Sequence, residues 1–143
     1  MRLELECRGV RLLACDESWL EKSLTQDPPE SKRVVDLRKV NEISQLPSDA
    51  LKEKSIRRVS IPVTAQSWSE QDMDTLRREF LRGDSPVVVI SKAGKRAALM
   101  VLQHVARVQK WTPAQALEKC SEVAQDSQLR PLLEEYLTRH QRA

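Results

Sequence analysis

The chain has 143 residues, enough for one domain with a sizeable core. Its net charge of +3 is small and dispersed and only 3% of its residues are aromatic, which argues against a nucleic-acid-binding surface. No run approaches the roughly 18 apolar residues of a membrane span, so we expect a cytoplasmic protein that binds neither nucleic acid nor membrane.

The first third of the chain predicts strands around one short helix. Residues 3–14 are expected to be extended, with Gly9 at a turn between two strands. Asp16 is a candidate cap for a helix over residues 17–24. Short β-branched runs at residues 33–38 and 55–63 predict two further strands.

Two helices and a buried strand are expected next. Ser69 and Asp72 form a capping box for a helix with one apolar stripe, which Gly83 is expected to end. The run "PVVVI" at residues 86–90 is typical of a strand inside a parallel sheet, and a helix is expected over residues 94–109.

The last third is predicted to be helical. Thr112 and Gln115 form a second capping box, with proline between them, for a helix through about Ala124. A final helix is expected from Leu129 to Arg142. Its predicted core face consists of Leu132, Leu133, Tyr136 and Leu137.

Alternating strands and helices predict an α/β fold, with a mostly parallel central sheet and helices on both faces. We expect residues 1–143 to form a single domain, in which residues 1–30 supply the N-terminal strands and the short helix. Cys7, Cys15 and Cys120 are widely spaced and lack a metal-binding pattern, so we interpret them as reduced thiols and expect no metal and no cofactor.

The stretch "SKAGKR" joins the buried strand to its helix. The first amides of a helix have no partner within it, and they favour an anion together with the helix dipole. Gly94 would permit a tight turn, and Arg96 could bind two oxygens at once. The alternative is that Gly94 only makes a turn and the basic residues are solvated. The candidate phosphate-binding residues are Ser91, Lys92, Ala93, Gly94, Lys95 and Arg96.

Four segments in order, "VVDLRKVNE", "IPVTAQSWSEQDM", "PVVVISKAGKRAALMVL" and "WTPAQALEKCSEVAQDSQLRPLLEEYL", give the chain a family resemblance. Together they resemble the beta-lactamase-hydrolase-like phosphatases, a bacterial branch of the cysteine-dependent protein tyrosine and dual-specificity phosphatases. The resemblance implies that Ser91 occupies the position of the nucleophilic cysteine and Arg96 that of the phosphate-binding arginine. It also implies a phosphatase-like fold.

Serine at position 91 changes the expected chemistry. A thiol in such a loop ionises near neutral pH, whereas an alcohol needs an adjacent general base. Neither His104 nor His140 is placed by the sequence beside Ser91. Ile90, Ala97 and the absence of a carboxylate in "TAQSW" are further departures from the phosphatase pattern.

The sequence leaves several functions open. We expect a catalytically inactive domain that binds phosphate, another oxyanion, or a phosphorylated protein or small molecule. The alternatives are an active tyrosine or dual-specificity phosphatase studied as a Cys-to-Ser variant, a rhodanese-like domain, and an interaction domain with an empty loop. The rhodanese alternative arises because the loop is one residue shorter than in phosphatases and because "VVDLR" is followed by Glu42.

Two side chains outside the loop are also candidates. Arg38, at the end of its strand, could approach the loop or form an ion pair with Glu42. Trp68 could form a pocket wall, although stapling the start of the helix after Ser69 is the stronger interpretation.

Overall fold

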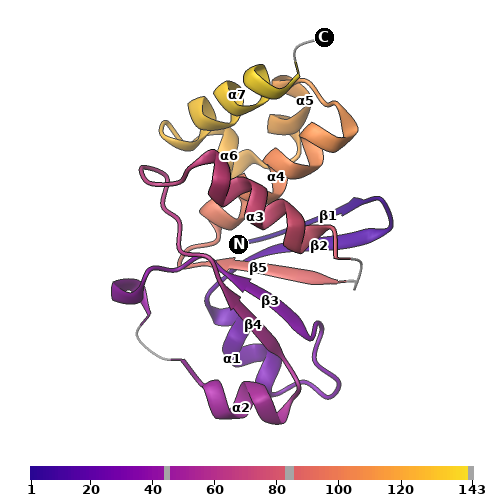
Figure 1. Ribbon diagram of the computed structural model, residues 1–143, viewed down its shortest axis with the longest axis vertical. Coiled ribbons are helices and arrows are strands. Elements are labelled where there is room, and N and C mark those ends of the chain that lie inside the picture. Colours follow the sequence, from indigo (N-terminus) through magenta and orange to yellow (C-terminus); the bar gives the residue numbers. More distant parts are fainter. Residues whose placement is uncertain (44–45, 83–85, 142–143) are drawn as a thin grey trace.

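The computed structural model describes residues 1–43, 46–82 and 86–141. A five-stranded sheet in the order β1-β2-β5-β3-β4 crosses the middle of the molecule (Figure 1). Strands β1 and β2 are antiparallel, and the other neighbours are parallel. The strands are β1 (Arg2–Cys7), β2 (Val10–Asp16), β3 (Arg33–Asp36), β4 (Arg57–Ser60) and β5 (Val87–Ser91).

Helices cover both faces of this sheet. In Figure 1, α1 and α2 lie on one side and α3 to α7 on the other. The helices of the first side are α1 (Ser18–Leu24) and α2 (Ser48–Glu53), and the short 3₁₀ helix η1 (Val40–Glu42) follows β3. Those of the second side are α3 (Glu70–Phe80), α4 (Lys95–Gln109), α5 (Pro113–Glu118), α6 (Ser121–Ala124) and α7 (Leu129–His140). None of the helices in the described ranges is long and apolar enough to span a membrane.

The alternation of side chains along β5 divides the core into two layers. Val87 and Val89 pack with α3 to α7, whereas Val88 and Ile90 pack with α1 and α2. All four side chains are fully buried. A fully apolar strand is therefore stable here because both sheet faces are covered. The predicted α/β fold with helices on both faces is confirmed.

The capping boxes predicted at Ser69 and Thr112 are confirmed. Ser69 and Thr112 each accept a hydrogen bond from the backbone amide three residues later, as in a capping box. Gly9 lies in the turn between β1 and β2 with a φ of 80°. Asp16 accepts from the amide and hydroxyl of Ser18, but the N-cap residue of α1 is Glu17, so the predicted cap lies one residue too early.

The helices differ from the prediction at several points. The helix predicted from Thr112 to Ala124 is wrong, because the chain breaks at Cys120, whose φ of −150° is extended, and continues as α6. The break lets both Cys120 and Val123 be buried. Helix α2 and η1 were not predicted. Gly83 and Arg142, expected at helix ends, lie outside the described residues.

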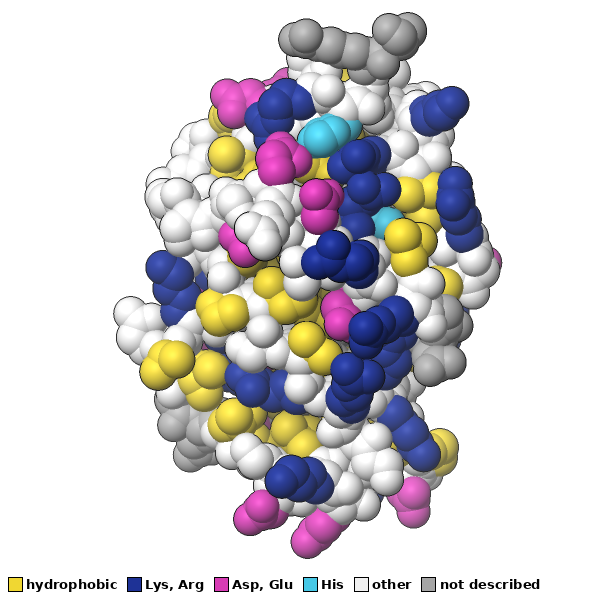
Figure 2. Space-filling view, in the orientation of Figure 1, with side chains coloured by type: hydrophobic (Ala, Val, Ile, Leu, Met, Phe, Trp, Pro, Cys, Tyr) yellow, Lys and Arg dark blue, Asp and Glu magenta, His cyan; other side chains and the backbone are white. Residues whose placement is uncertain are grey.

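Figure 2 shows a band of Lys and Arg side chains down the face that carries α3. Several arginines of α7, β3, and the end of α3 pair with carboxylates. Glu79 forms ion pairs with Arg33 and Arg82, and Glu70 forms one with Arg139. Part of the positive charge of this region is therefore neutralised locally.

Candidate functional site

The carboxyl ends of β2, β3, β4 and β5 meet at one edge of the sheet, and the link from β5 to α4 lies among them. This link is short. Ser91 is the last residue of β5, Gly94 caps α4 with a φ of 92°, and the helix begins at Lys95. A Cβ at Gly94 would lie 3.2 Å from the amide nitrogen of Asp16 and 3.3 Å from Met1. The positive φ and the limited space therefore both favour glycine at this position.

Ser91 faces the protein interior. It is 1% exposed, and its hydroxyl accepts a hydrogen bond of 3.1 Å from the amide of Ala97 in the first turn of α4. The side chain thus caps a helix from inside the fold.

The two histidines lie away from Ser91. The His104 ring packs edge-on against Phe80, and its Nδ1 lies 3.4 Å from Nε of Arg77. His140 contacts Glu70 at 2.9 Å. Neither histidine makes a contact with Ser91 that would make it a general base.

The cysteines are free and buried, as predicted for reduced thiols. Cys15 comes nearest to the link, because it pairs in register with Ile90, the residue before Ser91. Burial raises the pKa of Cys15 to about 11, so it is a neutral thiol at pH 7. It does not replace the missing nucleophile.

Arg96 is held in a fixed orientation by two other segments. Its Nη1 and Nη2 donate to the two carboxylate oxygens of Glu42, at 3.0 and 2.5 Å, and Nη1 also donates to the carbonyl oxygen of Val63 at 2.6 Å. The hydrogen bonds from Arg96 are the main reason that the pKa of Glu42 lies below its ordinary value. Glu42 also accepts from the amide of Lys39, the N-cap residue of η1, so its carboxylate links η1 to Arg96 of α4.

One edge of the Arg96 guanidinium remains available. A guanidinium has five N–H donors in a plane, and the three contacts to Glu42 and Val63 use both hydrogens of Nη1 and one of Nη2. Within the described part of the chain, the Nε hydrogen and the second Nη2 hydrogen donate to nothing. These two hydrogens lie side by side, in the arrangement that binds two oxygens of one oxyanion.

The first turn of α4 provides further donors. Ser91 accepts from the amide of Ala97, and the carbonyl of Gly94 accepts from Ala98. The amides of Lys95 and Arg96 have no acceptor among the residues that the structure describes. Such amides point out of the helix N-terminus, where the dipole favours negative charge.

A hollow of about 300 Å³ adjoins these donors. It is lined by Glu42, Thr64, Ala65, Gln66, Lys95, Arg96, Asp126, Gln128 and Leu129. Lys95 lies 3.5 Å from Asp126 across one side, and the Gln66 side chain contacts Gln128 at 3.4 Å. Lys92 and Ala93 are exposed beside it. The hollow therefore brings together the β4–α3 connection, the N-terminus of α4 and the turn before α7.

Arg38 does not pair with Glu42, and that interpretation was wrong. Its Nε and Nη2 donate to the carboxylate of Asp36 at 3.0 and 2.9 Å, and its Nη1 lies 3.3 Å from Glu17. Burial alone would raise the pKa of Asp36, but hydrogen bonds from Arg38 and Arg58 outweigh it and hold the pKa below its ordinary value. This buried ion cluster fixes the end of β3 beside the link.

Trp68 contacts α7. Its ring centroid lies 5.9 Å from that of Tyr136, and the side chain packs against the core on the α3–α7 side. Trp68 is not among the residues that line the hollow beside Arg96. The pocket-wall interpretation is therefore not supported.

Within residues 1–43, 46–82 and 86–141, no group of three or more His, Cys, Asp or Glu side chains is arranged to hold a metal ion.

Comparisons with known proteins give structural similarity only. No family model matches the chain, and no curated protein matches it. The solved structure of PTPMT1 in complex with PI(5)P has 19% identity and a TM-score of 0.67, with 90% of each chain covered. A protein from Shewanella putrefaciens CN-32, called "Putative phosphatase (DUF442)", has 17% identity and a TM-score of 0.68, with 97% of this chain and 88% of that chain covered.

A third neighbour comes from Neisseria meningitidis Z2491 and carries the description "putative phosphatase". It has 16% identity and a TM-score of 0.65, with 89% of this chain and 92% of that chain covered. At these identities the similarity shows the fold alone: the chain has an α/β fold like that of solved structures described as phosphatases.

The most informative residues missed by the sequence interpretation are Glu42 and Val63, which hold Arg96. Glu42 was noticed only as a partner for Arg38 or as a rhodanese-like feature. A partly buried arginine on the first turn of a helix favours a carboxylate partner, and Glu42 follows the neighbouring strand β3. The position of Glu42 was therefore the available signal. The acceptor at Val63 is a backbone carbonyl, and because every residue has one, the sequence cannot indicate this contact.

Proposed function

We propose that this phosphatase-like domain binds the phosphate group of a ligand at residues 91–96 and performs no covalent chemistry on it. The observation that carries this proposal is the fixed orientation of Arg96. Glu42 and Val63 hold its guanidinium, while the Nε and outer Nη2 hydrogens remain available on one edge. A preorganised pair of donors loses little side-chain entropy when an oxyanion binds.

The charge around the hollow supports an anionic ligand. Lys92, Lys95 and Arg96 provide three positive charges near the link, and Glu42 and Asp126 provide two negative ones. The N-terminus of the 15-residue helix α4 adds roughly half a positive charge. The amides of Lys95 and Arg96 would be the backbone donors to the bound phosphate.

The absence of covalent chemistry rests on Ser91. Its hydroxyl is buried and engaged with the amide of Ala97, and no histidine contacts it. A serine nucleophile must be exposed to the substrate and activated by a base. The neutral thiol of Cys15 offers no substitute.

The ligand class follows from the size of the hollow and from one structural neighbour. A volume of about 300 Å³ accommodates a phosphate and a small group attached to it. The PTPMT1 structure contains the phosphoinositide PI(5)P, a phosphorylated small molecule. A phosphorylated small molecule is therefore the first class to test, and a phosphorylated protein side chain is the second.

Calorimetric titration with inorganic phosphate and with vanadate tests the binding. We expect saturable binding by the wild-type chain and binding weaker by about tenfold or more in Arg96→Met, because charge-assisted hydrogen bonds are lost. Arg130→Met is the matched control, since Arg130 is an exposed arginine on α7 that forms an ion pair with Glu134 and is not among the residues that line the hollow. Absence of binding by the wild type, or equal loss in both variants, would contradict the proposal and favour an interaction domain with an empty loop.

An aryl phosphate assay tests the second half of the proposal. We expect the wild-type chain to give no turnover above that of Ser91→Ala. Phosphatase activity in Ser91→Cys would support the alternative that serine replaces the nucleophile of an active phosphatase. Sulfur transfer from thiosulfate by Ser91→Cys, without phosphatase activity, would instead support the rhodanese-like alternative.

A further inference from the structure

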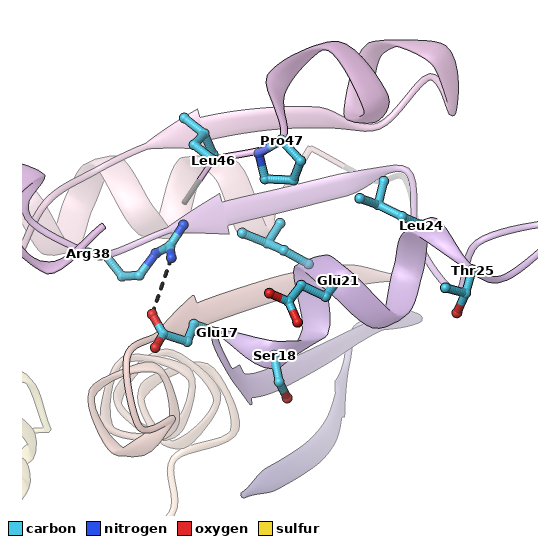
Figure 3. A pocket seen from close by; sticks show the side chains of 9 residues that line it. Glu17, Ser18, Glu21, Leu24, Thr25, Arg38, Leu46 and Pro47 are labelled. Carbon is cyan, nitrogen blue, oxygen red and sulfur yellow. Dashed lines mark hydrogen bonds and ion pairs between the residues drawn. The ribbon is translucent and has the colours of Figure 1, made fainter. Parts of the chain in front are cut away.

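A second and larger hollow lies between α1 and the segment that leads into α2 (Figure 3). Its volume is about 770 Å³, within the range of small-molecule sites. Leu20, at 2% exposed, and Leu24 give it an apolar wall on α1, and Leu46 and Pro47 form the facing wall. It shares no lining residue with the hollow beside Arg96. An aliphatic group placed here would be removed from water on two sides.

Two carboxylates stand on the α1 side of this hollow. Glu17 caps α1 and Glu21 follows four residues later, so both lie on one face of the helix. Figure 3 shows both side chains beside the hollow, with Arg38 facing Glu17. Across the described ranges, the carboxylate of Glu21 has no hydrogen bond or ion pair, whereas Glu17 accepts from Arg38 at 3.3 Å.

Arg38 does not make this hollow an anion site. Its guanidinium already donates to Asp36 through Nε and Nη2 and to Glu17 through Nη1. Asp36 also accepts from Arg58. Asp36, Glu17 and Glu21 supply three carboxylates here. Arg38 and Arg58 supply two guanidinium groups, so one negative charge is in excess. That excess is on Glu21, at the edge of an apolar surface.

We propose that this hollow binds a small organic cation, an ammonium group carried on an aliphatic chain. The chain would lie between Leu20, Leu24 and the 46–47 segment, and the ammonium would donate to the carboxylates of Glu21 and Glu17. Glu17 can accept such a donor because only one of its two oxygens is used by Arg38. This assignment does not depend on oxyanion binding at Arg96.

The test is an NMR titration of the whole chain, labelled on its leucine methyl groups, with n-hexylammonium at pH 7. We expect saturable shifts at Leu20 and Leu24. Neutral 1-hexanol has the same chain without the charge, and we expect it to bind at least about tenfold more weakly because it lacks a charge-assisted hydrogen bond.

Two charge-neutralising variants provide the matched comparison. Glu21→Gln should weaken n-hexylammonium binding by about fivefold, the effect of one largely exposed ion pair. Glu118→Gln removes another exposed carboxylate, on α5, and should leave binding unchanged. The assignment would be overturned if n-hexylammonium gave no saturable shifts, if 1-hexanol bound equally well, or if the two variants behaved alike. Phosphate titration of Glu21→Gln should remain as in the wild type.

Discussion

The buried histidine on α4 should make the stability of the fold depend on pH. His104 is 1% exposed, and its ring lies against Phe80 in the layer between α3 and α4. Burial is the main reason that its pKa falls from 6.5 to about 4, and the positive charges of Arg77, Arg107 and Arg8 lower it further. The folded state therefore holds the imidazole neutral under conditions in which the unfolded chain binds a proton.

The sign and size of the effect follow from proton linkage. Between pH 6.5 and pH 4 the unfolded state binds more protons at this position than the folded state, so stability falls as the pH is lowered. The contribution of His104 is fully present above about pH 6.5. With these two pKa values, lowering the pH from 7 to 4.5 should cost about 2.5 kcal/mol of unfolding free energy.

Urea unfolding of the wild type and of His104→Asn at pH 7 and pH 4.5 isolates the contribution of His104 to the unfolding free energy. Asparagine is neutral at both values, and the carboxylates that also titrate in this range are present in both proteins. We expect the wild type to lose about 2.5 kcal/mol more than the variant on acidification, whatever the variant costs at pH 7. Equal losses in the two proteins would refute the reasoning, since His104 would then not titrate differently in the two states.

Three further substitutions test features that stabilise the fold. In urea unfolding, Asp36→Asn should lower the free energy of unfolding by about 3–5 kcal/mol, because it leaves the charge of the buried Arg38 uncompensated. As a control, Asp49→Asn at an exposed position should change it by less than about 0.5 kcal/mol. In thermal unfolding, Gly94→Ala should lower the unfolding temperature more than Gly9→Ala, because both positions have positive φ but only Gly94 is crowded. Equal decreases in the unfolding temperature would exclude crowding. Thr112→Ala should lower the unfolding free energy by about 1 kcal/mol through loss of the cap, and an unchanged value would show that the cap contributes nothing.

The fold was largely predictable because its strongest signals are local. The continuous apolar run of β5 and the capping boxes at Ser69 and Thr112 depend on neighbours a few residues apart, and each was read correctly. The break at Cys120 was not predictable in the same way. It depends on burying Cys120 and Val123 against other helices, which is a tertiary effect that overrides helix propensity.

The position of the link between β5 and α4 was predictable, but the contacts of its side chains were not. The pattern of strand, glycine and helix correctly located Gly94 at the start of α4. Ser91 was expected to line an anion-binding loop, but its hydroxyl is buried and accepts from the amide of Ala97. The partners of Arg96 come from residues 54 and 33 positions away, and no local pattern encodes such contacts.

The most direct test of the central claim is a two-dimensional ¹H–¹⁵N NMR titration of the wild-type chain with inorganic phosphate. If the link holds an oxyanion, the amide signals of Lys95 and Arg96 should shift saturably, with the Arg96 Nε–H signal, while those of α7 beyond Tyr136 stay in place. Shifts spread evenly over the exposed lysines and arginines, or no saturable shift at Lys95 and Arg96, would contradict the account.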